Sequence, residues 1–518
     1  MKPYAFDTED DGNGNFIQGG VYDGDRFAFF DTREGMGSWI ARTRGRFYTF
    51  NLEYDLVNLF WPDLAPVSYW RSNGRILSGR VGAASLFDLV WGMGGVGMAF
   101  CAGLLGRKKG ALDARSREYL QGDLENTWAV LERLSLELSE TGAGKPSGTL
   151  AGASLRAFKS MGGFVAPLPA ALEPYARGAY YGGRTECFDF RDRVVSGFDV
   201  NSMFPAAMLD GDFPAGRWSA TRSVGAADVV CATVLVPPQH VPPLPLRRER
   251  LIFPTGRFRG TWTGEELRHA VGSCGVVVLK LHHAWAAGAR VRPFDIFCAT
   301  LFERRKRDAF SNYYGKRLMN SLYGKLAQQG ALEFVSGTMD ALTTKLLTLP
   351  PRDYNPMWPA LITARARVSL HKLLDTAGAG LVYCDTDSIF AANPHARKFK
   401  TGAGLGELKL EHERATMTVL APKLYRLVEG GVAHYRSRGV AGFASEEFFA
   451  LTGYRGPSEQ FFETGSTRYR RPTRLYEAVR RKMRPNVWNE ITKSFGADGF
   501  EKRERLGDGR TRALVVLE

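Results

Sequence analysis

The alternation of apolar and polar positions is clearest around two acidic residues late in the chain. An apolar, strand-like segment at residues 381–382 leads into Tyr-Cys-Asp-Thr-Asp-Ser (383–388), and residues 389–390 resume the apolar pattern. Two apolar runs around a short polar turn predict a β-hairpin. Because side chains alternate along a strand, we expect the carboxylates of Asp385 and Asp387 on one face.

The first third of the chain predicts a sheet followed by a helix. Helical periodicity runs from residue 119 through 134, so residues 119 and 123 share one helix face. Apolar alternation before it indicates a strand at 4–9, a hairpin with an Asp23-Gly24 turn between strands at 16–22 and 26–30, and a strand at 46–50.

Further stretches complete the predicted framework. An apolar strand at 194–200 carries Asp199 near its end, and helical periodicity covers 302–326 with a strongly basic start. Residues 141–154, rich in Gly, Ser, Thr and Ala, indicate a domain boundary. The uncharged run 89–105 contains five glycines. Because it is slightly short for a membrane span, it predicts buried packing.

Composition narrows the class of protein. The 518 residues are enough for several domains, and 44% hydrophobic residues allow sizeable cores. The net charge of +15 implies an anionic partner. Nucleic acid is the first choice and an anionic membrane surface is the competitor. The six cysteines form no CxxC pair, which is typical of reduced, buried thiols in a cytosolic protein. The eight histidines show no zinc-motif spacing, and no signal or transit peptide is visible.

Two sets of carboxylates suggest divalent metals. Asp385 and Asp387 repel each other unless a cation neutralises them, and oxygen-only ligands favour Mg²⁺ or Mn²⁺. A solvated polar turn is the alternative. The second set lies on three predicted elements and could hold two metals against a phosphodiester, with Tyr119 orienting a water; isolated surface charges are its alternative. That set comprises Asp7, Glu9, Asp55 and Asp123.

The order of the second set resembles the three exonuclease motifs of family B DNA polymerases and related proofreading 3′–5′ exonucleases. The resemblance extends to neighbouring residues. Ser85 and Leu86 match the motif that binds the frayed primer end, and Asn51 and Tyr54 match contacts to the single strand. Lys109 matches the catalytic-lysine segment of the family, although a plain basic patch is the alternative reading there.

The rest of the chain resembles the polymerase motifs of the same family, in the same order. Tyr180, Gly182 and Gly183 match Tyr-x-Gly-Gly, and Lys423 and Tyr425 match the Lys-x-Tyr motif that holds the primer terminus. Residues 438–440 match the basic-Gly-hydrophobic segment that follows. Motif A starts at Asp199, with Met203 in place of Leu and Phe204 in place of the Tyr that excludes a ribose. Motif B contains Lys316, Asn320 and Tyr323, and motif C is the 383–388 segment.

The resemblance implies roles for these residues. Asp199 and Asp387 would bridge two Mg²⁺ ions per active site (or Mn²⁺), with Asp385 beside them and a carbonyl from Val200. Lys316 and Arg304 would neutralise the nucleoside triphosphate, and Tyr323 would stack on the base pair. Loss of the Phe204 hydroxyl puts the strength of sugar discrimination in question, although its ring still blocks a ribose.

The fold class implied is α/β multidomain, with a ribonuclease-H-like 3′–5′ exonuclease domain followed by a right-hand polymerase domain. Long stretches on either side of motif B match the positions of the two terminal-protein-region insertions of protein-primed phage polymerases. The expected boundaries are an exonuclease domain at 1–140, a palm at 141–211 and 357–455, insertions at 212–293 and 329–356, fingers at 294–328 and a thumb at 456–518.

The predicted function is therefore a proofreading DNA polymerase of a phage, virus or linear plasmid, protein-primed and strand-displacing. Its expected partners are template and primer DNA, dNTPs, a terminal protein and a single-stranded DNA-binding protein, in the host cytoplasm and without a membrane. A primer-dependent or self-priming element polymerase is the alternative. A catalytically inactive nucleic-acid-binding scaffold is the candidate from another class.

Overall fold

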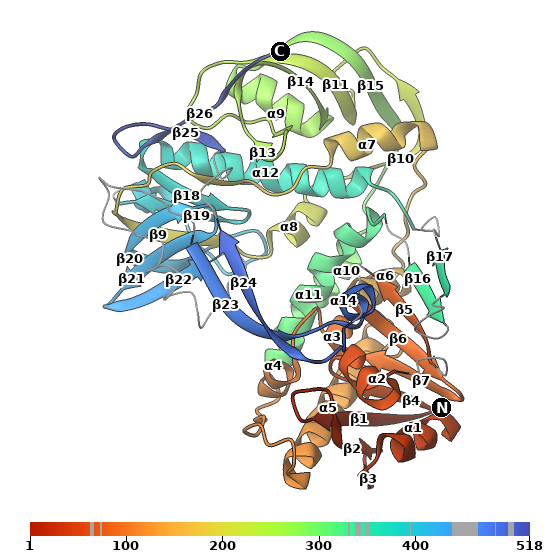
Figure 1. Cartoon of the computed structure of the whole chain (residues 1–518). Helices are drawn as coiled ribbons and strands as arrows, with labels where there is room; N and C mark the ends of the chain where they lie inside the picture. The colour runs from red at the N-terminus through yellow and green to blue at the C-terminus, as the bar shows by residue number, and fades with distance from the viewer. Residues whose placement is uncertain are drawn as a thin grey trace. The chain divides into compact units, whose positions relative to one another are not determined.

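The computed structural model describes ten ranges of the chain: 1–62, 67–72, 75–329, 332–336, 343–347, 353–393, 395–437, 465–481, 483–495 and 502–518. The chain forms two compact units, each assembled from separate segments (Figure 1). Unit 1 contains Met1–Phe164, Ile296–Arg352 and Tyr469–Ile491, and unit 2 contains Val165–Asp295, Asp353–Arg468 and Thr492–Glu518.

Unit 1 is built on a nine-stranded mixed sheet with the order β17-β16-β5-β6-β7-β4-β1-β2-β3. The predicted strands at 4–9 and 46–50 and the predicted hairpin are all present. Strands β1, β4 and β7 are parallel, and β1–β2–β3 are antiparallel. The strands are β1 (Lys2–Asp10), β2 (Phe16–Tyr22), β3 (Phe27–Phe30), β4 (Gly45–Thr49), β5 (Val67–Ser72), β6 (Arg75–Val81), β7 (Ala84–Asp88), β16 (Leu332–Ser336) and β17 (Thr343–Leu347).

Helices cover both faces of this sheet because successive β1 side chains point to opposite sides. Phe6 packs in a core with the buried residues of α1 (Arg33–Arg42) and α2 (Leu52–Phe60), whereas Ala5 packs against α5 (Arg117–Glu140). The helix predicted at 119–134 is thus confirmed as part of α5. The apolar run 89–105 forms the short helices α3 (Leu89–Gly92) and α4 (Met98–Gly103), and no described helix has the length and apolar character of a membrane span.

The domain boundary predicted at 141–154 is wrong, because this segment lies inside unit 1. Helix α6 (Leu150–Ser160) begins inside it, with Thr149 as N-cap accepting a hydrogen bond from the Gly152 amide. Ser154 Oγ donates to the Leu318 carbonyl at 2.6 Å, on α11 (Ala309–Leu326). The segment therefore packs in unit 1, and unit 1 continues to Phe164.

The single helix predicted over 302–326 is in fact two. Helix α10 (Asp295–Arg304) ends before Asp308, whose side chain caps α11 by accepting a hydrogen bond from the Ser311 amide. Arg304, predicted to bind the triphosphate, is instead buried. Its guanidinium lies 2.8 Å from Glu137 and 2.5 Å from Glu140 on α5. Because those carboxylates already neutralise it, this prediction is corrected: Arg304 holds α10 to α5.

Unit 2 contains a seven-stranded sheet with the order β22-β21-β20-β9-β19-β18-β8, which includes the predicted hairpin of residues 381–390 and the strand predicted at 194–200. Helix α12 (Met357–Ala377) packs against this sheet on one side and against α9 and β14 on the other (Figure 1). The sheet comprises β8 (Thr185–Cys187), β9 (Arg193–Val200), β18 (Leu381–Asp385), β19 (Ser388–Ala392), β20 (Leu408–Ala421), β21 (Leu424–Glu429) and β22 (Val432–Ser437).

The range 212–293 forms most of a second sheet in unit 2, with the order β10-β15-β11-β14-β27 and its own buried core. Its elements are β10 (Phe213–Ala220), β11 (Val229–Val236), β12 (Leu246–Arg247), β13 (Leu251–Ile252), β14 (Thr255–Thr263), α9 (Gly264–Cys274) and β15 (Val277–Val291). Two short helices, α7 (Glu173–Ala179) and α8 (Met203–Leu209), complete the middle of the chain.

The range 456–518, predicted as one thumb, divides between the two units. The strands β25 and β26 form an antiparallel hairpin around residues 507–509, and β27 joins the second sheet of unit 2 by pairing with β14 in parallel. The thumb prediction is therefore too broad at its end. The described elements here are β23 (Gly465–Pro472), α14 (Leu475–Arg481), β24 (Trp488–Phe495), β25 (Arg503–Arg505), β26 (Thr511–Ala513) and β27 (Val515–Leu517).

We predict that Arg304→Met lowers the free energy of unfolding by about 2 kcal/mol or more, because Glu137 loses one of its buried partners. The matched control is Lys316→Met, an exposed position on α11, which should change it by no more than about 0.5 kcal/mol. Urea unfolding of both variants followed by circular dichroism measures the difference. Equal midpoints for the two variants would contradict the structural role of Arg304.

Candidate functional site

Three carboxylates converge in unit 1. Asp7 and Glu9 lie on β1 and Asp123 lies on α5, and one oxygen atom from each falls within 4.8 Å of the others. Burial and the Coulomb repulsion of Asp123 raise the pKa of Asp7 to about 7, although the charge of Lys109 and a hydrogen bond from the Thr8 amide act in the opposite direction. Burial and the neighbouring Asp7 and Asp123 raise the pKa of Glu9 to about 8. A buried acidic trio whose charges oppose one another suits a divalent cation.

Asp55, the fourth predicted carboxylate, lies on α2 and is fully buried. Its two oxygens accept hydrogen bonds of 2.7 Å from the hydroxyls of Thr8 and Thr49. Burial and the charge of Asp7 raise its pKa. Asp55 therefore interacts electrostatically with Asp7 of the trio. Hydrogen bonds from residues of β1 and β4 hold its carboxylate in place. The two threonines were not predicted, since nothing in their local sequence distinguishes them.

Lys109 and Tyr119 lie beside the same trio. Lys109 Nζ is 2.5 Å from Asp123 Oδ2 and 5.2 Å from the centre of the Tyr119 ring. Burial lowers the pKa of Lys109, but hydrogen bonds to Asp123 and Tyr119 outweigh this and raise it overall. The ammonium is therefore charged, and it lies against the carboxylate of Asp123.

The residues predicted to contact single-stranded nucleic acid lie in two different environments. Asn51 and Tyr54 line a cleft of about 250 Å³ in unit 1, together with Arg75, Trp91 and Arg474. Leu86, in contrast, is 1% exposed and belongs to the core of the sheet. Its side chain has no surface to offer a nucleic acid, so that prediction is corrected. Ser85 is half-buried on the same strand.

In unit 2 the predicted motif C is a tight hairpin. Thr386 takes a left-handed conformation with φ of 61°, and the Asp387 amide donates to the Asp385 carbonyl at 2.7 Å. The next strand pairs Ser388 with Asp199 on β9, and the Val200 amide donates to the Asp387 carbonyl at 2.8 Å. The backbone thus brings Asp387 beside the end of β9 that carries Asp199.

Asp385 has different neighbours from Asp387. Lys423 Nζ lies 2.6 Å from both of its oxygens, and Thr185 Oγ1 donates to it at 2.9 Å. Lys423 has φ of 63°, and its amide donates to the Tyr383 hydroxyl at 2.9 Å. The Tyr425 ring packs 5.3 Å from that of Tyr383. The Lys-x-Tyr segment therefore borders Asp385 directly.

The Tyr-x-Gly-Gly segment packs on the tip of this hairpin. A Cβ atom on Gly183 would lie 2.7 Å from the Thr386 side chain, and the Thr386 amide donates to the Arg184 carbonyl at 2.7 Å. The paired glycines were predicted to allow a close backbone approach, and at Gly183 the approach is to the motif C turn. Tyr180 ends α7, and Gly182 accepts a hydrogen bond from Arg367.

Motif A turns sharply after β9. Ser202 has φ of 52° and is the N-cap of α8, which carries Phe204 in its first turn with the ring half-buried. The Asn201 amide donates to the Glu407 carbonyl at 2.9 Å. These contacts fix the direction in which the chain leaves the carboxylate of Asp199.

Helix α11 in unit 1 presents the motif B side chains. Lys316, Arg317 and Asn320 line a cleft of about 710 Å³. Both cations are exposed, and Asn320 Oδ1 is buried with no hydrogen-bond partner among the described residues. Tyr323 lies half-buried one turn further on. An open basic cleft with an unsatisfied polar atom fits an anionic ligand. Arg317 is a second cation in the lining of this cleft.

The donors of both carboxylate sets suit Mg²⁺ or Mn²⁺, because every proposed ligand atom is an oxygen. In unit 1 the fit has a second support. Without a metal ion, the three mutually repelling carboxylates of the trio would share the single ammonium of Lys109. The structure does not describe residues 438–464, so the predicted segment 438–440 lies outside the described residues.

We predict that Asp7→Asn with Glu9→Gln stabilises the metal-free chain, most strongly at pH 8. Both acids have pKa values above their unfolded ones, so wild-type stability falls as pH rises from about 4 to 8 and stays low above that. The amides remove this loss, and each kcal/mol regained should raise the melting temperature by about 2–4 °C. Thermal unfolding with a chelator at pH 5 and pH 8 tests this, and an equal gain at both pH values would contradict it.

Comparison with known sequences finds similarity to DNA polymerases over part of the chain. Residues 106–335 match the family model of DNA polymerase type B, organellar and viral. A "Probable DNA polymerase" of Ascobolus immersus is 25% identical over 288 residues, covering 48% of this chain and 24% of that protein. Another, of Neurospora intermedia, is 24% identical over 294 residues, covering 48% and 30%. The chain thus spans less than a third of either relative.

Solved structures extend the similarity to nearly the whole chain. Phi29 DNA polymerase complexed with primer-template DNA covers 96% of this chain and 100% of its own, with a TM-score of 0.75 and 17% identity. The same enzyme with incoming nucleotide covers 95% and 98%, with a TM-score of 0.73 and 17% identity. The chain therefore has the multidomain fold of Phi29 DNA polymerase. The resemblance indicated by the motifs is confirmed, since residues 106–335 carry the sequence pattern of the organellar and viral type B DNA polymerases and the chain has the family B polymerase fold.

Proposed function

We propose that this protein is a DNA-directed DNA polymerase with a 3′–5′ exonuclease. The observation that carries the proposal is the coincidence of fold and motifs. A fold shared with Phi29 DNA polymerase over 96% of the chain contains two carboxylate sets, each on the elements that the motifs predicted. Structures of that relative hold primer-template DNA and incoming nucleotides, which are the substrates we propose here.

In synthesis, Asp199 and Asp387 would hold two Mg²⁺ ions, with Asp385 and the Val200 carbonyl beside them. The ions supply charge stabilisation for attack of the primer 3′-hydroxyl on the α-phosphate. Lys316 and Arg317 neutralise the triphosphate from the exposed face of α11, and Tyr323 stacks on the new base pair. The Phe204 ring excludes a ribose by its bulk. Lys423 and Tyr425 hold the primer terminus near Asp385.

In degradation, Asp7, Glu9 and Asp123 would hold the metals, and Asp55 would complete the set. The ions supply an activated water and stabilise the leaving oxygen. Tyr119 and Lys109 orient that water, because Lys109 lies against Asp123 and the Tyr119 ring lies beside Lys109. Asn51 and Tyr54 guide the frayed strand along their cleft. Two chemically separate activities in one chain would allow a misinserted nucleotide to be removed.

We further propose protein priming, with strand displacement, for a phage, virus or linear plasmid genome. Its support is positional. Range 212–293 forms a sheet with its own core, and the described strands of 329–356 form a hairpin that extends the nine-stranded sheet. These lie where protein-primed polymerases carry their two insertions. The first deoxynucleotide would be joined to a Ser, Thr or Tyr hydroxyl of a separate terminal protein.

We expect Asp387→Ala to reduce synthesis by about 10³-fold or more while 3′–5′ degradation continues, because the two carboxylate sets are separate. Asp7→Ala with Glu9→Ala should do the reverse. The measurement is extension and shortening of one labelled primer-template by each variant. As a matched control, Glu249→Gln changes an exposed carboxylate between β12 and β13 and should leave both activities intact. Synthesis that persists in Asp387→Ala would refute the assignment of the palm site.

Protein priming predicts transfer of the first deoxynucleotide to protein. Wild type is incubated with template, Mg²⁺ and a labelled dNTP, with and without a candidate terminal protein. Label should appear on that protein only when wild-type polymerase is present, and Asp387→Ala is the negative control. If a DNA primer is extended but no protein is labelled, the primer-dependent or self-priming alternative is favoured. If neither synthesis nor degradation occurs, the inactive scaffold is favoured.

A further inference from the structure

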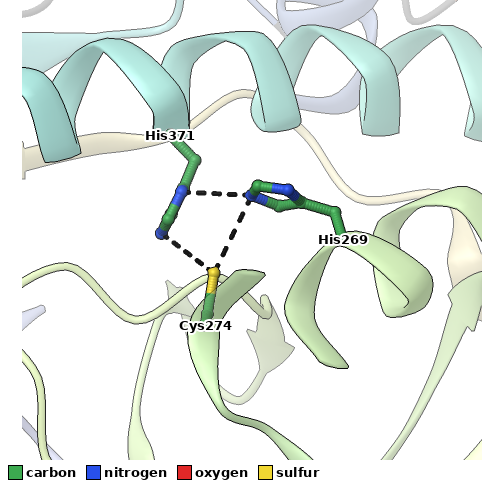
Figure 2. Close-up of side chains that lie close together, drawn as sticks. All are labelled: His269, Cys274 and His371. Carbon is green, nitrogen blue, oxygen red and sulfur yellow. Dashed lines mark hydrogen bonds between the residues drawn. The ribbon is translucent and has the colours of Figure 1, made fainter. Parts of the chain in front are cut away.

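A cluster of soft metal ligands lies in unit 2, formed by residues far apart in the sequence. His269 and Cys274 lie on α9 and His371 lies on α12. One ligand atom from each falls within 4.8 Å of the others. Figure 2 shows the three side chains turned toward one another, two from the end of α9 and one from α12. None of the three was singled out by the sequence, because their spacing matches no metal motif.

The distances fit a tetrahedral ion. His269 Nε2 lies 3.2 Å from His371 Nδ1, and Cys274 Sγ lies 3.9 Å from His269 Nε2 and 4.0 Å from His371 Nε2 (Figure 2). Two nitrogens bound to Zn²⁺ at a tetrahedral angle lie about 3.3 Å apart, and a nitrogen and a sulfur about 3.6 Å apart. The two distances to His269 Nε2 differ from these values by a few tenths of an ångström at most.

A hydrogen bond to the backbone identifies which nitrogen of His371 has a free lone pair. His371 Nε2 lies 2.9 Å from the Val241 carbonyl, which can only accept a hydrogen bond, so Nε2 carries the proton. The lone pair of Nδ1 is therefore directed at His269. A backbone carbonyl that orients a histidine in this way is a usual neighbour of a zinc ligand.

We propose that His269, Cys274 and His371 form a binding site for a thiophilic divalent cation, with Zn²⁺ as its natural occupant. The Cys274 thiol loses its proton to solvent and binds as thiolate, and both imidazoles bind neutral. The fourth position is taken by water or by Asp375, an exposed carboxylate one turn after His371 on α12, whose charge acts on both His269 and Cys274.

The site would act structurally, by joining α9 to α12. The two helices are already held by ion pairs along the same line: Arg365 lies 2.7 Å from Glu265, and the fully buried Arg367 lies 2.7 Å from Glu266. His269 and His371 continue this line of contacts at the end of α9. A cation there would fix the sheet formed by range 212–293 to the helix that leads into the motif C hairpin.

The test uses the full chain, freed of metal by a chelator and then titrated with Co²⁺ in excess Mg²⁺, which occupies the carboxylate sites. We expect one equivalent of Co²⁺ with a thiolate-to-metal charge-transfer band and tetrahedral d–d absorption, both removed by Zn²⁺. Cys274→Ser and His269→Gln should lose the charge-transfer band. His283→Gln, an exposed histidine elsewhere in unit 2, is the matched control and should retain it.

A second readout does not depend on colour. Zn²⁺ should raise the melting temperature of wild type and of His283→Gln, and should not do so for Cys274→Ser. Circular dichroism of metal-free Cys274→Ser should match that of wild type, because Cys274 is only partly buried at a helix end. Absence of the thiolate band in correctly folded wild type, or an identical band in Cys274→Ser, would overturn the proposal and leave a hydrogen-bonded histidine pair.

Discussion

The architecture of unit 2 depends on one buried guanidinium. Arg367 on α12 is 2% exposed, and it donates to both oxygens of Glu266 on α9 and to the Tyr181 and Gly182 carbonyls. Removing one partner of such a pair leaves an uncompensated charge that costs about 3–5 kcal/mol. Three parts of the chain that are distant in sequence must therefore meet at this residue: range 212–293, the Tyr-x-Gly-Gly segment and the helix before motif C.

This constraint positions the hairpin that carries Asp385 and Asp387. The Tyr-x-Gly-Gly segment held by Arg367 continues into Gly183 and Arg184, which pack on the Thr386 turn. The hairpin is thus held on both sides within the sheet, because β8 pairs with its strand β18 and β9 pairs with its strand β19. The metal binding proposed for this carboxylate pair would gain from a fixed geometry, because the supporting contacts leave the turn little freedom.

Features that depend on residues close together in the sequence were predictable. The hairpin at 381–390, the strand carrying Asp199 and the helix face shared by Tyr119 and Asp123 all follow from short-range patterns. The break between α10 and α11 had a signal that was missed, since Asp308 precedes Ser311 with the spacing of an N-cap. The apolar periodicity on either side of it hid the cap.

Other features depend on contacts between residues that are far apart in the sequence. Arg304 looks like a free cation until Glu137 and Glu140, more than 160 positions earlier, are placed beside it. Leu86 matches a nucleic-acid motif, but its neighbours in the sheet bury it. His269 and His371 are 102 residues apart, so only the packing of α9 on α12 brings them together. Motif spacing can predict a local ligand set, whereas sets built across helices need the fold.

The contact between Lys423 and Asp385 would couple the binding of a nucleic-acid strand to the binding of a cation. The ammonium lies on both oxygens of the carboxylate, yet about half of its side chain is exposed, so it can leave without disturbing the core. A single ammonium cannot neutralise Asp385 and a phosphate at the same time. Whatever draws Lys423 onto a nucleic-acid backbone also releases Asp385 as a bare anion, and the arrival of a strand end would in this way increase the attraction of the palm for a cation.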